Sequence, residues 1–376
     1  MRRHIFCLIL CLGVVPITST LFLRGQTSQP DDAILAALAS HQYNLEGDGR
    51  KFLLDEAQNI DFFLLGELHG DNEIPAFLTG LWPEMWKEGY RNVAAEVSPW
   101  AAQQLEFGEG MEIQGLWTKP QAAVVHAFAA SGAYVLWGCD MEEVQPQYLI
   151  RELARINPDD PHLKQMMELT RDGYSRKIAP ELLDLAKASQ GNRDVLVNDV
   201  SLRQNLLATL EVETHRLRPE TKMLAQNERE LLMKEQFLTH FRSASRTGSK
   251  VLFRFGRNHL HRGYDVRGVS TLGNFIAEFA IAQGLKTFNV GAFGAGGKAT
   301  LLGNTFDADE RNDELAFALL AEKAKYQETL YDLRPLRQLL HQVPQNKRSA
   351  LEVNLTYWAD AYDALICYKD VTPLRP

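Results

Sequence analysis

Short apolar runs that alternate with helical stretches constrain the fold of this chain more than any other feature. The strongest run, residues 62–65 in FFLLGELHG, is apolar at every position, which is typical of a strand buried on both faces of a sheet. Strands are predicted at residues 60–65, 92–95, 134–138, 250–255, 286–293 and 362–368. Because helical patterns separate most of these strands, the sequence predicts an α/β fold with a central, mostly parallel sheet flanked by helices.

One long segment departs from this alternation. Residues from about 145 to 246 carry charged, amphipathic helical patterns and almost no strand-like run. We interpret this segment as a large helical insertion in a single hydrolase-like α/β domain that spans residues 31–376. Residues 32–44 and 49–59 are predicted helices ahead of the first strand. The acidic run 306–314 is a predicted solvated loop, with a metal site as the alternative.

The first 24 residues have the pattern of an export signal. Arg2 and Arg3 precede an apolar core at residues 5–17, and residues 18–20 offer small side chains for cleavage. The core is too short to span a membrane comfortably, so a cleaved signal is the first expectation and an uncleaved membrane anchor is the alternative. The protein is therefore expected to be exported, and to be periplasmic, extracellular or anchored by this segment.

Composition excludes one class of partner. The chain carries 48 acidic and 40 basic residues, a formal net charge of -8, and it lacks a basic stripe interleaved with aromatic residues. These features exclude nucleic acid as the main partner. A small-molecule substrate is the partner that the hydrolase hypothesis below implies. Beyond the export segment the cysteines are Cys139 and Cys367. Both lie in apolar runs, which predicts buried free thiols, with a disulfide between them as the alternative.

Polar residues gather where the predicted strands end. In a parallel sheet the loops beyond the carboxyl ends of the strands meet at one edge, and ligands bind there. Four strands deliver these side chains to that edge: Glu67, His69, Glu96, Cys139, Asp140, Arg257, Asn258, His259 and His261. The coincidence of imidazoles and carboxylates from separate strands predicts a functional site.

One short pattern occurs twice at this edge. Gly66 to His69 and Gly256 to His259 both read glycine, two residues, histidine, and each closes an apolar strand. A glycine at this place lets the loop fold back, so that the histidine points across the mouth of the sheet. If the two loops follow neighbouring strands, His69 and His259 lie close together.

These side chains suit hydrolysis. A histidine whose pKa is near neutrality can take a proton from water, while a carboxylate fixes its tautomer and stabilises the imidazolium that forms. We therefore predict catalytic roles for His69, Glu67, Glu96 and His259. No G-x-S-x-G is present, so serine chemistry is not indicated. The glycine-rich run at residues 291–300 lacks the first glycine and the Ser or Thr of a phosphate loop, and it is read as a flexible loop.

Five further residues are candidates for binding the substrate. Arg254 and Arg257 suit an anionic group or the oxygen on which charge develops, although Arg254, inside a strand, has pairing with a buried acid as its alternative. Asn258, His261 and Asp140 complete the set. For His261 the alternative is a side chain that faces solvent or caps a helix.

A metal ion is the main competing use of the same side chains. His69, Glu67, Glu96 and His259 are ligand types that bind zinc or manganese and leave a position open for water. No H-E-x-x-H helix is present, and spacing alone does not choose between metal-assisted and metal-free activation of water. The leading hypothesis requires no cofactor, with a divalent metal as the alternative.

The motifs resemble those of the erythromycin esterase, ChaN and Tiki superfamily, whose members share two G-x-x-H motifs on an α/β scaffold. The chain is most similar to erythromycin esterase-like proteins. The resemblance rests on these blocks: LLGELHGDNEIPAFLTGLW, GYRNVAAEVSP, VLWGCDMEE, NERELLMKEQFLTH, KVLFRFGRNHLHRG and DALICYKDVTPLRP. It implies that His69 is the general base, with Glu67, Glu96 and His259 around it. Arg257 departs from the histidine-asparagine-alanine-histidine run usual in erythromycin esterases.

The leading hypothesis is an exported hydrolase that cleaves an ester, lactone or amide with water activated by His69. Two alternatives follow from the resemblance. One is a haem- or metal-binding protein resembling ChaN, and the other is a metal-dependent peptidase resembling Tiki.

Overall fold

An eight-stranded sheet forms the centre of the computed structural model, which describes residues 32–107, 119–142, 145–189, 196–244, 250–301, 303–311 and 315–374. The strand order is β1-β9-β10-β6-β2-β5-β3-β4. The strands are β1 (Gln42–Asn44), β2 (Phe62–Glu67), β3 (Tyr90–Ala95), β4 (Leu136–Gly138), β5 (Lys250–Gly256), β6 (Thr287–Gly294), β9 (Glu328–Asp332) and β10 (Ala364–Tyr368). Neighbouring strands from β10 to β4 are parallel, whereas β9 is antiparallel to β10 and to β1. The predicted α/β class with a mostly parallel sheet is confirmed.

Strand β2 lies at the middle of the sheet and is buried on both faces. Because successive side chains of a strand point to opposite sides, Phe63 and Leu65 pack into one apolar cluster, and Phe62 and Leu64 into another. The first cluster includes residues of α3 (Glu73–Lys87) and α5 (Lys119–Ala129), and the second includes residues of α10 (Lys222–Ala244) and α11 (Leu272–Gln283). This sandwich explains why the run is apolar at every position.

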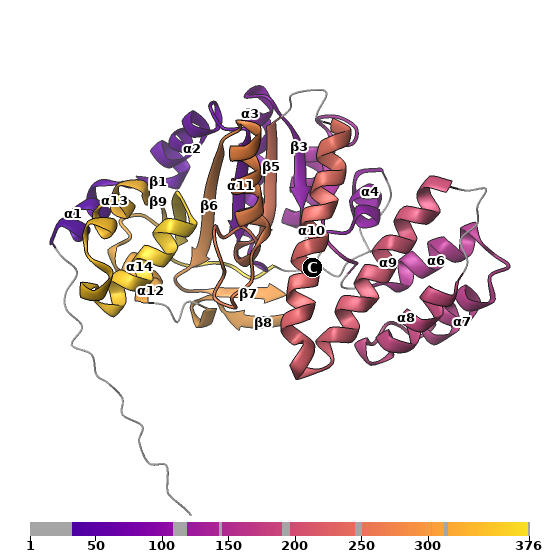
Figure 1. The fold of residues 1–376 in the computed structure, drawn as a ribbon. Coiled ribbons are helices and arrows are strands. Elements are labelled where there is room, and N and C mark those ends of the chain that lie inside the picture. Colours follow the sequence, from indigo (N-terminus) through magenta and orange to yellow (C-terminus); the bar gives the residue numbers. More distant parts are fainter. Residues whose placement is uncertain are drawn as a thin grey trace, which may run out of the picture.

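Further helices belong to the α/β part of the chain. They are α1 (Asp32–Ser40), α2 (Arg50–Ala57), α4 (Pro99–Phe107), α12 (Leu315–Lys323), α13 (Arg334–Gln342) and α14 (Ala350–Ala361). Helices α1, α12, α13 and α14 gather around β9 and β10 at one end of the sheet (Figure 1). The predicted helix at residues 49–59 corresponds to α2.

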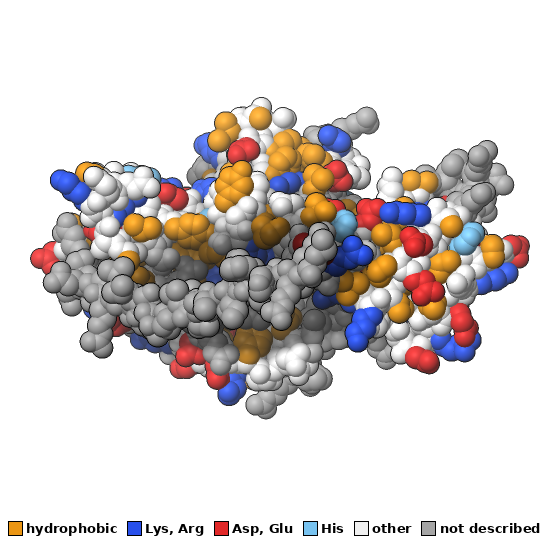
Figure 2. Space-filling view, turned by 60° about the horizontal axis from the view of Figure 1, so that its bottom comes forward, with side chains coloured by type: hydrophobic (Ala, Val, Ile, Leu, Met, Phe, Trp, Pro, Cys, Tyr) orange, Lys and Arg blue, Asp and Glu red, His pale blue; other side chains and the backbone are white. Residues whose placement is uncertain are grey.

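Between β4 and β5 the described chain is helical. This segment contains α6 (Gln147–Ile156), α7 (Pro161–Leu169), α8 (Ala179–Ala188), α9 (Leu196–Arg216) and α10. Helices α6 to α9 form a lobe beside the sheet, and α10 returns from the lobe to lie along the sheet (Figure 1). The lobe has its own apolar cluster, which includes Leu149, Leu163, Leu182 and Leu210. Figure 2 shows charged side chains of both signs interspersed over the lobe.

Several local predictions differ from the structure. The predicted helix at 32–44 ends at Ser40, because residues 42–44 pair with β9 as strand β1. Strand β9 itself was not predicted. The expected glycine loop at 291–300 instead contains the end of β6 and the start of β7 (Lys298–Leu301), which pairs with β8 (Asn304–Asp307). The predicted acidic loop likewise begins within β8 and continues as a short 3₁₀ helix at Ala308–Arg311. These local structures depend on pairing with another strand, which is distant in the sequence for β1 and is the second strand of a hairpin for β7.

Two further findings concern the whole described chain. Cys139 and Cys367 are both buried free thiols, as predicted. Within the described ranges, no helix has the length and apolar character needed to cross a membrane. The predicted export segment lies outside the described residues.

Candidate functional site

Two histidines and an acid from three strand ends meet at the carboxyl edge of the sheet. His69 follows β2, Glu96 follows β3, and His259 lies in the short turn after β5. His69 Nε2 lies 3.2 Å from Glu96 Oε2, and His259 Nε2 lies 3.3 Å from Glu96 Oε1. One carboxylate therefore bridges the two imidazoles, which lie close together as the paired G-x-x-H motifs predict.

The outer nitrogen of each imidazole faces a further carboxylate. Glu67 Oε1 lies 3.2 Å from His69 Nδ1, and Glu230 Oε1, on α10, lies 2.5 Å from His259 Nδ1. The side chains thus alternate as Glu67, His69, Glu96, His259 and Glu230, and we call this arrangement the carboxylate–imidazole chain. Ionised carboxylates only accept hydrogen bonds, so each Nδ1 donates to its carboxylate, while the two Nε2 atoms form ion pairs with Glu96.

Other groups engage the carboxylate oxygens as well. Arg254 Nε donates to Glu67 Oε2 at 2.9 Å. The backbone N–H of Gly256 donates to Glu96 Oε2 at 2.6 Å, and Arg229 Nη2 donates to Glu96 Oε1 at 2.8 Å. Each oxygen of Glu96 consequently has an imidazole and a second donor, which fixes the orientation of the carboxylate between the two rings.

The two motif glycines are required by close approach between the loops. A Cβ added at Gly66 would lie 2.9 Å from the Cα of Arg257, and one added at Gly256 would lie 2.6 Å from His69 Nε2 and 3.3 Å from Glu96 Oε2. Neither glycine has a positive φ. The glycines therefore do not serve to fold the loops back, as the sequence suggested, but leave the space in which each motif packs against the other.

The charges of the carboxylate–imidazole chain determine its protonation. Burial alone would lower the pKa of His69, but Glu96 and Glu67 outweigh it and raise the pKa to about 10. Burial likewise opposes the charged form of His259, and Glu96 and Glu230 raise its pKa to about 9. Burial would raise the pKa of Glu96, yet the two imidazoles hold it well below its usual range. Near neutral pH both rings are therefore cations, in contrast to the near-neutral pKa expected from the sequence.

Helix α10 supplies two side chains that the sequence analysis did not assign to the site, Arg229 and Glu230. Arg229 Nε donates to Asp140 Oδ1 at 3.0 Å, and its Nη2 lies 2.5 Å from Asp140 Oδ2. Both residues fall on the buried stripe of α10 that contains Met233 and Phe237, which pack against the sheet. Two charged residues on an apolar stripe were the signal that could have revealed them.

Three of the predicted substrate-binding residues are engaged inside the protein. Asp140 binds Arg229. Arg254 binds Glu67 and, through Nη2, Gln121 Oε1 at 2.6 Å, which is the buried-acid pairing considered as its alternative. The guanidinium of Arg257 lies 4.6 Å from the ring centre of Phe317 and donates through Nη1 to a backbone carbonyl of β6 at 3.0 Å. These contacts engage the charged groups of all three residues within the protein.

The other two candidates take no part in the carboxylate–imidazole chain. Asn258 is exposed. His261 is buried, with its ring centre 4.5 Å from that of Tyr357 and 5.6 Å from that of Trp358. Burial lowers its pKa to about 4, so the ring is neutral. His261 therefore packs among aromatic rings and does not face solvent.

The donor atoms do not converge as the ligands of a metal ion would. Each ring nitrogen of His69 and His259 is turned toward a carboxylate oxygen. Within the described ranges, no group of three or more His, Cys, Asp or Glu side chains is placed to hold a metal. The arrangement of charges instead fits proton transfer between paired imidazoles and carboxylates.

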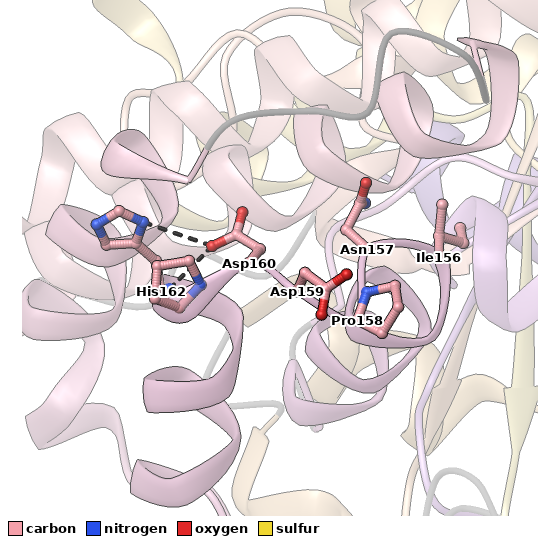
Figure 3. Close-up of a pocket in the computed structure, with 7 residues that line it drawn as sticks. Ile156, Asn157, Pro158, Asp159, Asp160 and His162 are labelled. Carbon is pink, nitrogen blue, oxygen red and sulfur yellow. Dashed lines mark hydrogen bonds and ion pairs between the residues drawn. The ribbon is translucent and has the colours of Figure 1, made fainter.

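A separate surface pocket lies in the helical lobe. It has a volume of about 450 Å³ and is formed by the connection from α6 to α7 (Figure 3). Asp160 in this connection accepts hydrogen bonds from backbone N–H groups at the start of α7, and His162 Nδ1 lies 3.4 Å from its Oδ1. The pocket shares no lining residue with the carboxylate–imidazole chain, and Asp160 is engaged both in capping of the helix and by Ser189 Oγ, which donates to Oδ2 at 2.5 Å.

Comparisons with known proteins bear on the fold. No protein-family model matches the chain, and no curated protein matches it by sequence. A protein from Bacillus cereus has a similar structure, with a TM-score of 0.62 and 13% identity over 92% of this chain and 100% of that chain. A succinoglycan biosynthesis protein has a TM-score of 0.57 and 14% identity, covering 92% of this chain and 99% of that chain.

A mutant of the erythromycin esterase EreC, in its open conformation, is also similar. Its TM-score is 0.59 at 14% identity, and the match covers 90% of this chain and 96% of that chain. The chain therefore shares the fold of erythromycin esterase, as the resemblance of the motifs predicts. At this level of identity the likeness is one of fold.

Proposed function

We propose that the chain is a hydrolase that cleaves an ester, lactone or amide with water activated by His69. The carboxylate–imidazole chain supports this proposal, because it joins two imidazoles through one carboxylate and leaves one of them accessible. The side chain of His69 is 30% exposed, whereas those of Glu96 and His259 are 13% and 8% exposed. His69 is thus the group that a substrate or a water molecule would meet first.

The proposed reaction uses His69 in its neutral form. Glu67 keeps the proton on Nδ1, so that Nε2, once it has lost the proton that faces Glu96, can accept a proton from water. The hydroxide attacks the carbonyl carbon, and the resulting imidazolium then gives its proton to the leaving oxygen or nitrogen, which yields a carboxylic acid and an alcohol or amine. Glu96 stays ionised and stabilises the imidazolium that forms.

Water is the preferred nucleophile because the cysteine at this edge is unsuited to attack. Cys139 follows β4 but is fully buried, and burial raises the pKa of its thiol. A buried, protonated thiol is a poor nucleophile.

Export is part of the proposal, on the strength of the N-terminal pattern alone. Haem binding and metal-dependent peptide cleavage are the alternative functions that follow from the resemblance. A change in the haem absorption spectrum when haem is added would favour the first. Loss of activity on chelation and its return with added divalent metal would favour the second.

The test is a screen of ester, lactone and amide substrates followed by substitution of the site. His69→Ala, His259→Ala and Glu96→Gln are each expected to abolish turnover while the circular dichroism spectrum is unchanged. His215→Ala is the matched control, because His215 Nδ1 lies 2.7 Å from Glu228 Oε2 in another imidazole–carboxylate pair, which lies outside the carboxylate–imidazole chain. Full activity in all three site variants would overturn the proposal.

A further inference from the structure

We propose that Glu230 is a positioning residue that fixes the ring of His259 so that Nε2 of the ring faces Glu96. This inference rests on the proposed function for its consequence in catalysis, and on the contacts of Glu230 for its structural part. Glu230 lies on α10, far in sequence from both motif loops. Neither G-x-x-H motif contains it.

Both oxygens of Glu230 are engaged by different elements. Oε1 lies 2.5 Å from His259 Nδ1, in the turn after β5. Oε2 accepts a hydrogen bond of 2.8 Å from the backbone N–H of Leu272, at the start of α11. Glu230 is only 1% exposed, and Leu272 is fully buried. A buried carboxylate that is held at both oxygens cannot rotate without losing a hydrogen bond, so it defines one direction for the imidazole.

The direction of the ring has a consequence for Glu96. Because Nδ1 of His259 donates to Glu230, the opposite nitrogen of the same ring is directed at Glu96 Oε1, 3.3 Å away. Glu96 in turn faces His69 through its other oxygen. Glu230 therefore acts on the proposed catalytic histidine through two intervening side chains and does not touch the site of reaction.

Helix α10 positions the carboxylate–imidazole chain at two points. Consecutive residues of an α-helix are separated by about 100° around the axis, so Arg229 and Glu230 reach different groups. Arg229 binds Glu96 and Asp140, and Glu230 binds His259. The helix that ends the helical segment thus holds both the central carboxylate and the inner imidazole.

Charged groups around His259 come from several elements. Glu96 follows β3, and Glu230 and Arg229 lie on α10. Burial lowers the pKa of Lys234, one turn further along α10, and the nearby carboxylates of Glu230 and Glu278 offset only part of this shift. Arg229 and Lys234 are unchanged when Glu230 is replaced. A change in the magnetic resonance signals of His259 would therefore result from the loss of Glu230 itself.

The experiment is nuclear magnetic resonance of the full chain labelled with ¹⁵N-histidine, with Glu230→Gln compared with Glu228→Gln. The signals of His259 are assigned by their loss in His259→Gln. Glu228 is the matched control because it lies on the same helix and pairs with His215 at 2.7 Å. We expect Glu230→Gln to remove the low-field Nδ1 proton signal of His259, and Glu228→Gln to leave it unchanged.

Activity supplies a second readout. With a substrate found by screening, Glu230→Gln is expected to lower kcat about 10- to 100-fold with little change in KM, which is the size of effect known for loss of an orienting partner of a metal-ligating histidine. Glu230→Asp, which keeps the charge, should restore part of the proton signal. Unchanged His259 signals in folded Glu230→Gln would overturn the inference.

The wild-type protein provides a test that does not depend on any variant folding. His259 must show a proton on Nδ1 that exchanges slowly with solvent, and its absence would also overturn the inference. Because these signals need no substrate, the inference and the proposed function fail separately: a hydrolase without the signal refutes the first, and the signal in a protein whose His69→Ala variant is fully active refutes the second.

Discussion

The carboxylate of Glu96 lies 3.2 Å from the imidazole of His69, although the two residues follow different strands and are separated in the sequence by helix α3. The other oxygen of Glu96 faces His259, so this one carboxylate connects both G-x-x-H motifs. The two strands that carry these residues, β2 and β3, flank β5 in the sheet. The parallel order of the three strands therefore brings the three loops together.

The pKa of His69 predicts the pH dependence of activity. Carboxylates on both sides raise this pKa to about 10, so the neutral base is scarce at pH 7 and becomes more abundant as the pH rises. We expect kcat/KM to rise about tenfold per pH unit between pH 7 and pH 9 and to level off near pH 10. A pH–rate profile measured with an uncharged substrate checks this, and a profile already flat at pH 7 would contradict it.

Replacing Glu67, the carboxylate that faces Nδ1 of His69, should shift the pH dependence of kcat/KM. Glu67 favours the charged form of His69 through the contact with Nδ1, so Glu67→Gln is expected to lower the pKa of His69 and to move the rising limb to lower pH. Measurement of kcat/KM from pH 5 to pH 10 in both proteins gives the shift. A limb that stays in place would show that Glu67 does not set the protonation of His69.

The same pKa shifts predict a contribution to stability with a defined sign. The folded protein raises the pKa of His69 and His259 from 6.5 to about 10 and about 9, so their contribution is complete below pH 6.5 and is lost as the pH rises toward 10. The lowered pKa of Glu96 contributes to the stability of the fold above pH 4.5, and this contribution is lost as the pH falls below that value. The carboxylate–imidazole chain should therefore stabilise the fold most between pH 4.5 and pH 6.5.

Denaturant unfolding of wild-type protein and of a His69→Gln, His259→Gln double variant tests this contribution. In the difference between the free energies of unfolding of the two proteins, the effects of other titrating groups cancel. Asp71 is one such group, because burial raises its pKa to about 8. The difference should shrink between pH 6.5 and pH 10. A difference that does not change with pH would refute the assignment.

The close packing of the two motif loops predicts the effect of a single methyl group. In Gly256→Ala the added Cβ would lie 2.6 Å from His69 Nε2, so the ring must shift from its position beside Glu96. A displacement of this kind costs about 100-fold in kcat when it occurs at a reacting group. The fold should remain intact, because the clash is with the end of a side chain. Gly132→Ala is the control, since its Cβ meets atoms only at 3.6 Å and beyond.

Enzyme assays and thermal unfolding of these two variants give the result. Loss of activity in Gly256→Ala with a melting temperature close to that of Gly132→Ala would agree with the prediction. Equal activity in the two variants would show that the contact between Gly256 and His69 does not matter for turnover.

The central sheet and the polar residues at its edge can be predicted from the amino-acid sequence without coordinates. The run at residues 62–65 is apolar at every position because β2 is covered on both faces. The predicted strands appear as β2, β3, β4, β5, β6 and β10. Parallel strands end at one edge of the sheet. The order of the predicted strands and the polar residues that follow them were therefore sufficient to predict that His69, Glu96 and His259 lie in one site.

The partner of each charged side chain, in contrast, depends on how the elements pack. Arg254 and Arg257 look alike in the sequence, yet one binds Glu67 and the other lies over Phe317. Glu230 reaches His259 because α10 packs along the sheet, and nothing in the local pattern of α10 specifies which loop it will meet. Hydrophobic periodicity is a local property that sets which face of an element is buried. The pairing of charges depends on distances between elements far apart in the sequence, and only the folded chain sets those distances.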